Sequence, residues 1–157
     1  MNKILKIIIF ILIGILQLTL MPLLQIKGMI PDLVLIGCVV FAIVDLQDDA
    51  LLLAIAGGLI LDWAGPLFFG FHTIVFVGFV LIIRFLLQKI LPDMNSILIF
   101  IITFFFALVY SCFQNLLYNR WPSLNLFSYG LYSAVLSIVF FFLLQRLHNN
   151  RNLAVKL

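Results

Sequence analysis

The sequence predicts an all-α integral membrane protein: a single transmembrane domain over residues 1–157, with six transmembrane helices in a compact bundle. The first observation is composition, because 66% of the residues are hydrophobic and 10% are charged, against about 25% charged in a soluble domain. The second is the absence of any glutamate, and the third is the division of the chain into long apolar runs by short polar segments. Such a chain cannot cover itself with a polar surface, which excludes a soluble protein. Its net charge of +3 is too small and too scattered to indicate a nucleic-acid partner.

The polar segments between the apolar runs define the six predicted spans. The first run is longer than the apolar region of about 7–15 residues in a secretory signal, so we expect an uncleaved span there. The spans are expected at residues 4–24, 31–46, 50–64, 71–91, 97–118 and 124–147.

The distribution of lysine and arginine orients these spans. With the N-terminus inside, seven of the nine basic residues lie on the cytoplasmic side, and only Lys27 and Arg120 lie outside. We therefore expect both termini in the cytoplasm. Tyr118, Trp121 and Tyr129 then lie at the outer ends of the fifth and sixth spans, where interfacial aromatic residues belong.

The second and third spans are short. Pro31 is suited to the first helical position of the second span, with Asp32 in its positively polarised first turn. The third span, residues 50–64, gives about 22 Å of helix against a hydrocarbon core of roughly 30 Å. Pro66 disfavours helical geometry at the glycine before it. We therefore predict that residues 65–70 are irregular at membrane depth, which is tolerated only where backbone is buried in protein or lines a wet cavity.

Asp62 is the main candidate for a functional residue. A charge at the centre of a bilayer costs about 2.5–3.5 kcal/mol, so intramembrane carboxylates are enriched in functional roles. Asp62 continues a face of small residues along the third span, which favours close helix packing and points the carboxylate into protein. That face comprises Ala50, Ala54, Gly57 and Gly58. Two interpretations stay open: Asp62 caps a broken helix or pairs with His72 or Arg84 to hold the bundle together, or it has a functional role.

The residues around the predicted break complete the candidate site, which comprises Gly58, Asp62, Pro66, Gly70, Phe71 and His72. Asp62 and His72 could relay protons or bind a small ligand, but one acid and one histidine do not complete an acid–base path. No zinc, nucleophile, phosphate-loop or nucleotide-binding pattern is present in the sequence. We therefore expect no enzymatic activity, no cofactor and no metal.

A second face of small residues lies on the sixth span, where it is suited to packing inside the bundle or against a partner helix. It comprises Gly130, Ala134, Ser133 and Ser137. Cys38 and Cys112 share no metal or redox spacing, so we interpret them as small buried hydrophobic residues. The phenylalanine runs at 104–106 and 140–142 are expected to meet lipid or neighbouring helices.

Three short motifs carry a resemblance to a known family. They are Pro-Asp-Leu-Val-Leu at 31–35, Gly-Leu-Ile-Leu-Asp at 58–62 and Pro-Leu-Phe-Phe-Gly-Phe at 66–71. With its length, six-span layout and basic cytoplasmic tail, the chain resembles the bacterial rod shape-determining protein MreD. The sequence departs from the family pattern where bulky aromatic residues replace smaller aliphatic ones, at Trp63, Phe68, Phe69 and Phe71.

The resemblance implies a non-enzymatic scaffold of the cell-elongation machinery in the bacterial inner membrane. It implies a membrane-anchored MreC-like partner and, indirectly, MreB-like filaments and peptidoglycan synthases, with membrane lipid around the bundle. MreD-like proteins are also similar in fold to the substrate-binding membrane subunits of energy-coupling-factor vitamin transporters, which are six-helix bundles. The alternative expectation is therefore a vitamin site formed by Asp62, His72, Gln114 and Asn115. A third is proton-coupled transport through Asp62 and His72.

Overall fold

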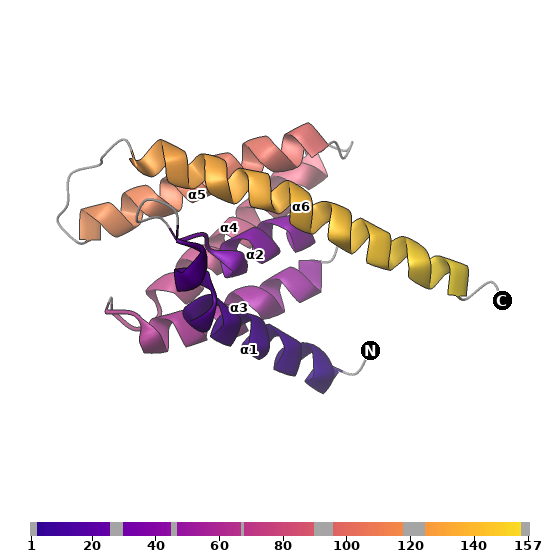
Figure 1. The fold of residues 1–157 in the computed structure, drawn as a ribbon, viewed down its shortest axis with the longest axis horizontal. Coiled ribbons are helices and arrows are strands. Elements are labelled where there is room, and N and C mark those ends of the chain that lie inside the picture. The colour runs from indigo at the N-terminus through magenta and orange to yellow at the C-terminus, as the bar shows by residue number, and fades with distance from the viewer. Residues whose placement is uncertain are drawn as a thin grey trace.

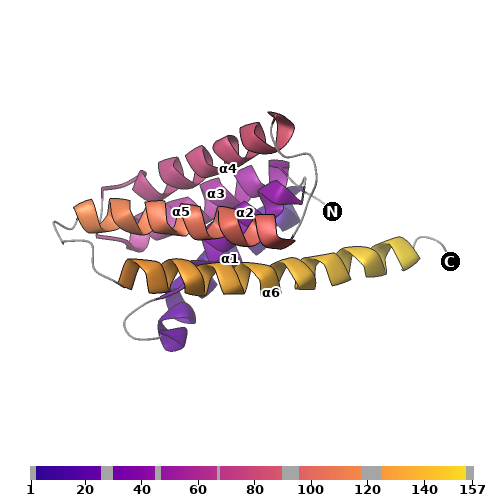
Figure 2. The ribbon, with the colours of Figure 1, turned by 90° about the horizontal axis from the view of Figure 1, so that it is seen from above.

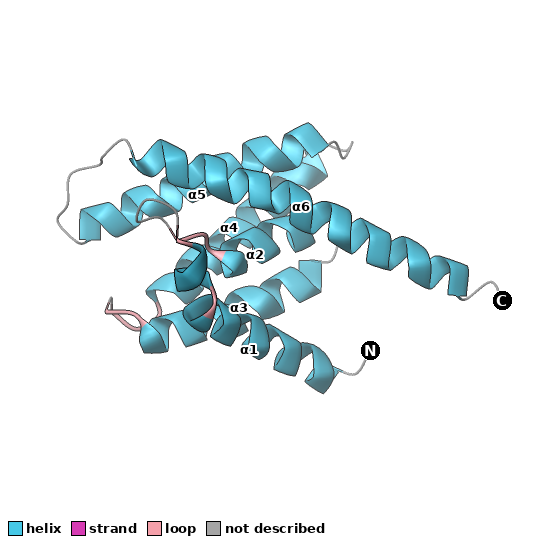
Figure 3. Cartoon of the chain, in the orientation of Figure 1, coloured by secondary structure: helices cyan, strands magenta, loops and turns pink. Residues whose placement is uncertain are grey.

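The computed structural model describes residues 3–25, 30–44, 47–66, 68–89, 96–117 and 125–154. Its regular elements are helices joined by short loops, and no strand occurs within these ranges (Figure 3). The elements are α1 (Lys3–Thr19), the short 3-10 helix η1 (Met21–Leu24), α2 (Leu33–Ile43), α3 (Gln47–Ala64), α4 (Phe71–Lys89), α5 (Ser96–Leu117) and α6 (Asn125–Ala154). The all-helical prediction is confirmed for this part of the chain.

The helices run back and forth along the long axis of the bundle (Figures 1 and 2). As a result, α1 begins and α6 ends at the same end of the molecule. A salt bridge from Lys6 Nζ to Asp49 Oδ1, 2.5 Å long, joins the first turns of α1 and α3. The start of α3 therefore lies at the same end as the start of α1.

The short helix α2 forms the centre of the bundle. Every residue from Val34 to Ile43 is buried, and α2 contacts each of the other five α-helices. A helix that is apolar all round lies either in a protein core or against lipid, and this one is enclosed between the α5–α6 pair and the α1–α3 pair (Figure 1). Its 11 residues span about 16 Å, so α2 is a core element that is shorter than the hydrocarbon layer.

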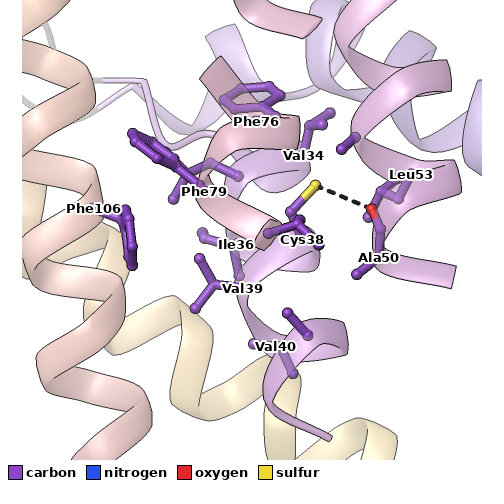
Figure 4. Close-up of a cluster of buried hydrophobic side chains, with 14 of the residues drawn as sticks. Val34, Ile36, Cys38, Val39, Val40, Ala50, Leu53, Phe76, Phe79 and Phe106 are labelled. Atoms are coloured by element: carbon purple, nitrogen blue, oxygen red, sulfur yellow. Dashed lines mark hydrogen bonds between the residues drawn. The ribbon is translucent and has the colours of Figure 1, made fainter. Parts of the chain in front are cut away.

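The packing between α2 and α3 is close because small residues are placed where the helices meet. The Cys38 Sγ lies 3.9 Å from the Ala50 carbonyl oxygen, to which it donates a weak hydrogen bond (Figure 4). A Cβ atom on Gly37 would lie 2.6 Å from the Leu53 side chain, and one on Gly57 would lie 2.6 Å from Val34. These contacts place α3 against the central helix and so set the position of Asp62.

Three helical segments of the described chain are long and apolar enough to cross a membrane. They are Ile4–Leu23, Ile97–Leu117 and Leu126–Leu144. The other apolar helical segments, Leu33–Ile43 and Phe71–Leu87, are shorter. Large apolar side chains are exposed along the outer surfaces of α1, α5 and α6, as expected of helices that face lipid.

The helix boundaries differ from the predicted spans at several points. Pro31 is not the first helical residue, because α2 starts at Leu33 with Asp32 as its N-cap. The third helix starts at Gln47, three residues earlier than predicted. The last helix continues to Ala154, past the predicted end of the sixth span at residue 147, since nothing in its polar final turns breaks a helix.

Some side chains also lie elsewhere than predicted. Cys38 is buried as expected, but Cys112 is exposed because it lies on the outer face of α5. Tyr129 is buried inside the bundle and does not lie at an exposed interfacial position. Tyr118 and Trp121 fall outside the described residues. Within the phenylalanine run at 104–106, Phe106 is buried among neighbouring helices and Phe105 is exposed.

Candidate functional site

The candidate site is built around the break between α3 and α4. The helix α3 ends at Ala64, as predicted, and the Gly65 amide donates to the Leu61 carbonyl at 2.7 Å to close its last turn. Gly70 has a φ of +97°, a left-handed conformation that residues with a Cβ adopt at a cost, and α4 begins directly after it. The predicted interruption near Pro66 is therefore confirmed, and Pro66 itself is exposed.

Asp62 is buried, with 4% of its surface exposed, and its carboxylate accepts four hydrogen-bonding contacts from the first turn of α4. Oδ1 lies 2.7 Å from the His72 backbone nitrogen and 2.8 Å from His72 Nδ1. Oδ2 lies 3.1 Å from the Thr73 backbone nitrogen and 2.6 Å from its hydroxyl. The prediction that Asp62 points into protein is confirmed.

These contacts make Asp62 a cap for a helix other than its own. The first amides of a helix lack intrahelical partners and carry partial positive charge, so a carboxylate placed there is stabilising. Of the partners considered from sequence, His72 and a broken-helix cap are both observed. Arg84 lies three turns further along α4 and is exposed. Thr73 binds Asp62 through two groups and was not predicted, because a threonine in an apolar run gives no signal of its partner.

Gly58 permits this arrangement. A Cβ atom at Gly58 would lie 2.7 Å from the Cα of Thr73 and 2.9 Å from its backbone nitrogen, closer than real side chains approach backbone. The two helices therefore cross almost backbone to backbone, one turn before Asp62. This close crossing brings the carboxylate within reach of the α4 amides.

The His72 ring is enclosed by aromatic side chains. Its centroid lies 5.3 Å from that of Phe71, 6.3 Å from Phe76 and 6.1 Å from Tyr110, all with tilted or edge-on geometry. His72 is 6% exposed, so it is not an interfacial polar residue. The rings exclude solvent and leave Nδ1 directed to Asp62.

Asp32 is a second buried carboxylate at the same end of the bundle. It caps its own helix, since Oδ1 accepts from the Leu35 amide at 3.0 Å, and its carboxylate interacts with the Tyr110 side chain. Gln17 supports this turn from α1: its Nε2 donates to the Pro31 carbonyl at 2.9 Å, and its Oε1 accepts from the Leu33 amide at 2.6 Å.

Each of the six α-helices thus sends a buried polar side chain to one end of the bundle. They are Gln17, Asp32, Asp62, His72, Tyr110 and Tyr129, from α1 to α6 in order. Sequence reasoning missed Gln17 and Tyr110. The sequence does show an amide and a hydroxyl within otherwise apolar spans. No spacing rule, however, predicts contacts between residues on different helices.

The predicted small-residue faces lie inside the bundle. Ala50, Ala54 and Ala134 are fully buried. A Cβ on Gly130 would lie 3.0 Å from the Phe104 ring of α5, which shows that this face packs on a neighbouring helix. The accompanying serines are buried too, and Ser137 Oγ donates to the Ala134 carbonyl at 2.7 Å.

The polar residues proposed for a vitamin site are bonded within the protein. Gln114 Nε2 donates to the Tyr110 hydroxyl at 2.9 Å, one turn away on the same helix. Asn115 Nδ2 donates to the Ser111 carbonyl at 3.0 Å. Together with the Asp62–His72 contact, these bonds occupy polar groups that would otherwise be available to bind a vitamin.

Chemically, the site holds helix ends together. It offers two buried carboxylates, and among the described residues no cluster of three histidine, cysteine or acidic side chains could hold a metal ion.

Comparisons with protein families, with curated proteins and with solved structures gave no match to this chain.

Proposed function

We propose that this protein is a non-enzymatic membrane scaffold of the bacterial cell-elongation machinery, crossing the inner membrane six times with both termini in the cytoplasm. In this proposal it resembles MreD and docks a membrane-anchored MreC-like partner. Through that partner it connects MreB-like filaments to peptidoglycan synthases and so helps to maintain rod shape.

The main observation that supports the proposal is the hydrogen bonding of the Asp62 carboxylate. Its two oxygens contact amides and side chains in the first turn of α4, and His72 is enclosed by rings. A carboxylate whose two oxygens are both bonded in this way holds the two helices together at their crossing. A bundle whose buried polar groups are devoted to its own geometry suits a scaffold, which has to present a constant surface.

The decisive test is genetic and biochemical. Deleting the gene from a rod-shaped host should produce rounded cells, and the intact chain should restore rods and co-purify with the MreC-like protein. Gly58→Leu should abolish both, because a large side chain cannot fit against the Thr73 backbone. Rod shape and co-purification that both survive in Gly58→Leu would show that the packing is misassigned. Rods that persist after deletion would refute the proposal.

The second candidate is a vitamin-binding subunit of the energy-coupling-factor type. The observation in its favour is the convergence of buried polar side chains from all six α-helices at one end of the bundle. The test is mass spectrometry of the purified protein for a bound vitamin, with Asp62→Asn as the comparison. A stoichiometric vitamin that is lost in the variant would favour transport, and its absence after growth in vitamin-rich medium would favour the scaffold.

A further inference from the structure

The three most exposed aromatic side chains of the described chain lie together around the α3–α4 break. Trp63 is 86% exposed, Phe69 is 67% exposed and Phe68 is 62% exposed. They fall within seven positions, on the last turn of α3 and on the loop that follows it. The buried core contains none of these rings, so their size is not explained by packing inside the bundle. Large exposed rings in so short a segment indicate an interaction surface.

The last turn of α3 carries this surface on one side and the Asp62 cap on the other. Asp62 is 4% exposed and faces the first turn of α4, whereas Trp63, the next residue, is the most exposed aromatic residue described. Successive residues of a helix are rotated by about 100° and differ little in height. The carboxylate and the indole therefore lie at nearly the same level along the axis of α3. Whatever binds Trp63 acts on the turn that holds Asp62.

The length of α3 shows which layer of the membrane this surface meets. The helix begins at the end of the bundle where the Lys6–Asp49 salt bridge lies, and its 18 residues rise about 27 Å, against a hydrocarbon core of roughly 30 Å. Figures 1 and 2 show that the α3–α4 loop lies at the opposite end, with the end of α5 and the start of α6. A helix that begins at one membrane boundary therefore brings the loop to about the other boundary.

The backbone of the loop excludes the hydrocarbon interior as its surroundings. Residues 65, 66 and 68–70 are not helical, and Pro66, Phe68 and Phe69 are exposed, so the protein does not cover the loop. Irregular backbone that protein does not cover needs water, whereas the exposed rings favour an apolar surrounding. The headgroup layer of a bilayer provides both, and tryptophan is enriched there. A phospholipid interface therefore fits this surface better than acyl chains or open water.

We propose that Trp63, Phe68 and Phe69 form an interfacial anchor that inserts among the phospholipids of the outer leaflet. The anchor holds the end of α3 at the membrane boundary, so lipid contacts fix the depth of Asp62 and of the first turn of α4. The break then lies at the boundary of the membrane and not within it. The inference rests on the six-span topology of the proposed function, and it adds the lipid surface as a binding partner of a defined segment.

The test is depth-dependent fluorescence quenching in vesicles that contain the purified protein. Trp121→Phe leaves Trp63 as the only tryptophan. Phospholipids brominated near the headgroup should quench Trp63 at least about twofold more than phospholipids brominated at the ends of the acyl chains. The control combines Trp63→Phe and Trp121→Phe with Phe105→Trp, which moves the indole to an exposed position near the middle of α5. Its fluorescence should show the reverse order of quenching.

Two outcomes of this measurement would overturn the anchor. Quenching of Trp63 in the same order as in the Phe105→Trp control would mean that the loop lies among acyl chains. Quenching by aqueous iodide but by neither lipid would mean that the rings lie in water. In living cells, a benzoylphenylalanine at Phe69 should crosslink to phospholipid, and capture of a protein by most of the molecules would show that the rings form a protein contact instead.

Phe69→Ser tests whether the rings anchor the helix end. In the Trp121→Phe background, Phe69→Ser should increase the quenching of Trp63 by iodide about twofold, because a weaker anchor lets the end of α3 reach water. Phe113→Ser, which removes an exposed ring from α5, should leave this quenching unchanged. Both variants should unfold at the temperature of their parent, since neither ring is buried. Equal quenching in Phe69→Ser and its parent would show that Phe69 is not part of an anchor.

The two proposals fail in different ways. If Trp63 is quenched in the expected order but cells keep their rod shape without this chain, the scaffold is wrong and the anchor stands. If Trp63 is quenched as deeply as the Phe105→Trp control while an MreC-like protein co-purifies, the anchor is wrong and the scaffold stands.

Discussion

Asp62 adds a second connection between α3 and α4 beside the chain that links them. Its carboxylate joins the end of α3 to the start of α4 through the amides of His72 and Thr73, although the chain between them is irregular. In a low-dielectric interior such bonds are strong, and leaving their donors unpaired is costly. The angle between these helices is therefore set by side-chain chemistry as much as by the loop.

Replacing Asp62 should destabilise the whole bundle. Asp62→Ala leaves two amides, an imidazole and a hydroxyl without their acceptor, and we expect a loss of about 3–5 kcal/mol in the free energy of unfolding. Asp62→Asn should lose less, since one amide oxygen still accepts. The measurement is reversible unfolding in mixed micelles.

Asp49→Ala is the matched control for this prediction. It also removes a carboxylate from α3, but one that pairs with Lys6 in a partly exposed position, where the expected loss is about 1 kcal/mol or less. Equal losses from Asp49→Ala and Asp62→Ala would contradict the capping role.

Gln17 should contribute more to the stability of the bundle than a polar residue on an apolar helix usually does. Gln17→Leu removes the partners of the Pro31 carbonyl and the Leu33 amide, and each buried group left unpaired costs about 1–3 kcal/mol. We expect earlier thermal unfolding and faster hydrogen exchange at the first turn of α2. Unchanged exchange there would show that another group satisfies this turn.

At the scale of elements, sequence reasoning located the break and one partner of Asp62, which is His72, but it did not predict Thr73. Pro66 and the charge at Asp62 are local signals, and they correctly predicted a helix end and an inward carboxylate. The contacts with Thr73, and those of Gln17 with the start of α2, join separate helices, so they depend on how the helices pack. That packing is decided by side-chain volumes at crossings, which have no short-range signature in the sequence.

Gly58 and Gly78 differ in how closely the rest of the chain approaches them. Gly58→Ala forces its methyl group into the Thr73 backbone, and we expect it to lower the free energy of unfolding by about 1–3 kcal/mol or more. Gly78→Ala enters open space, and we expect it to be neutral or to stabilise the isolated chain by up to about 1 kcal/mol. Unfolding of both purified variants under identical conditions provides the comparison. The opposite order of stabilities would mean that the α3–α4 crossing is wrongly described.

At the scale of the whole molecule, the α-helices alternate in direction, and the starts of α1 and α3 are joined by the Lys6–Asp49 salt bridge. Among the described residues, the basic ones predicted to be cytoplasmic lie in the first turn of α1 and in the second halves of α4 and α6, which point to that same end. This is the asymmetry that the positive-inside rule predicts for two cytoplasmic termini. The polar segments of the sequence predicted this alternation. The predicted helix bounds were wrong where a helix is shorter or longer than a standard span. The central helix is shorter than the span predicted for it, and the last helix is longer.

The topology gives the most direct prediction for the intact protein. Fusions of a cytoplasm-active reporter to the N-terminus and to the C-terminus should both be active, and periplasm-active fusions at the same positions should be silent. A fusion after residue 66, at the α3–α4 break, should show the reverse pattern. Termini on opposite sides of the membrane would refute the six-span arrangement.

The shortness of α2 has a consequence for biogenesis. A segment of 11 apolar residues preceded by Asp32 is a weak substrate for the insertion machinery, which selects stretches of about 20 residues. This helix should therefore enter the bilayer together with α3, as a preassembled hairpin held by Cys38, Ala50, Gly57 and Val34. Ribosome stalling that delays synthesis of α3 should then strand the nascent chain outside the membrane and expose it to quality-control proteases.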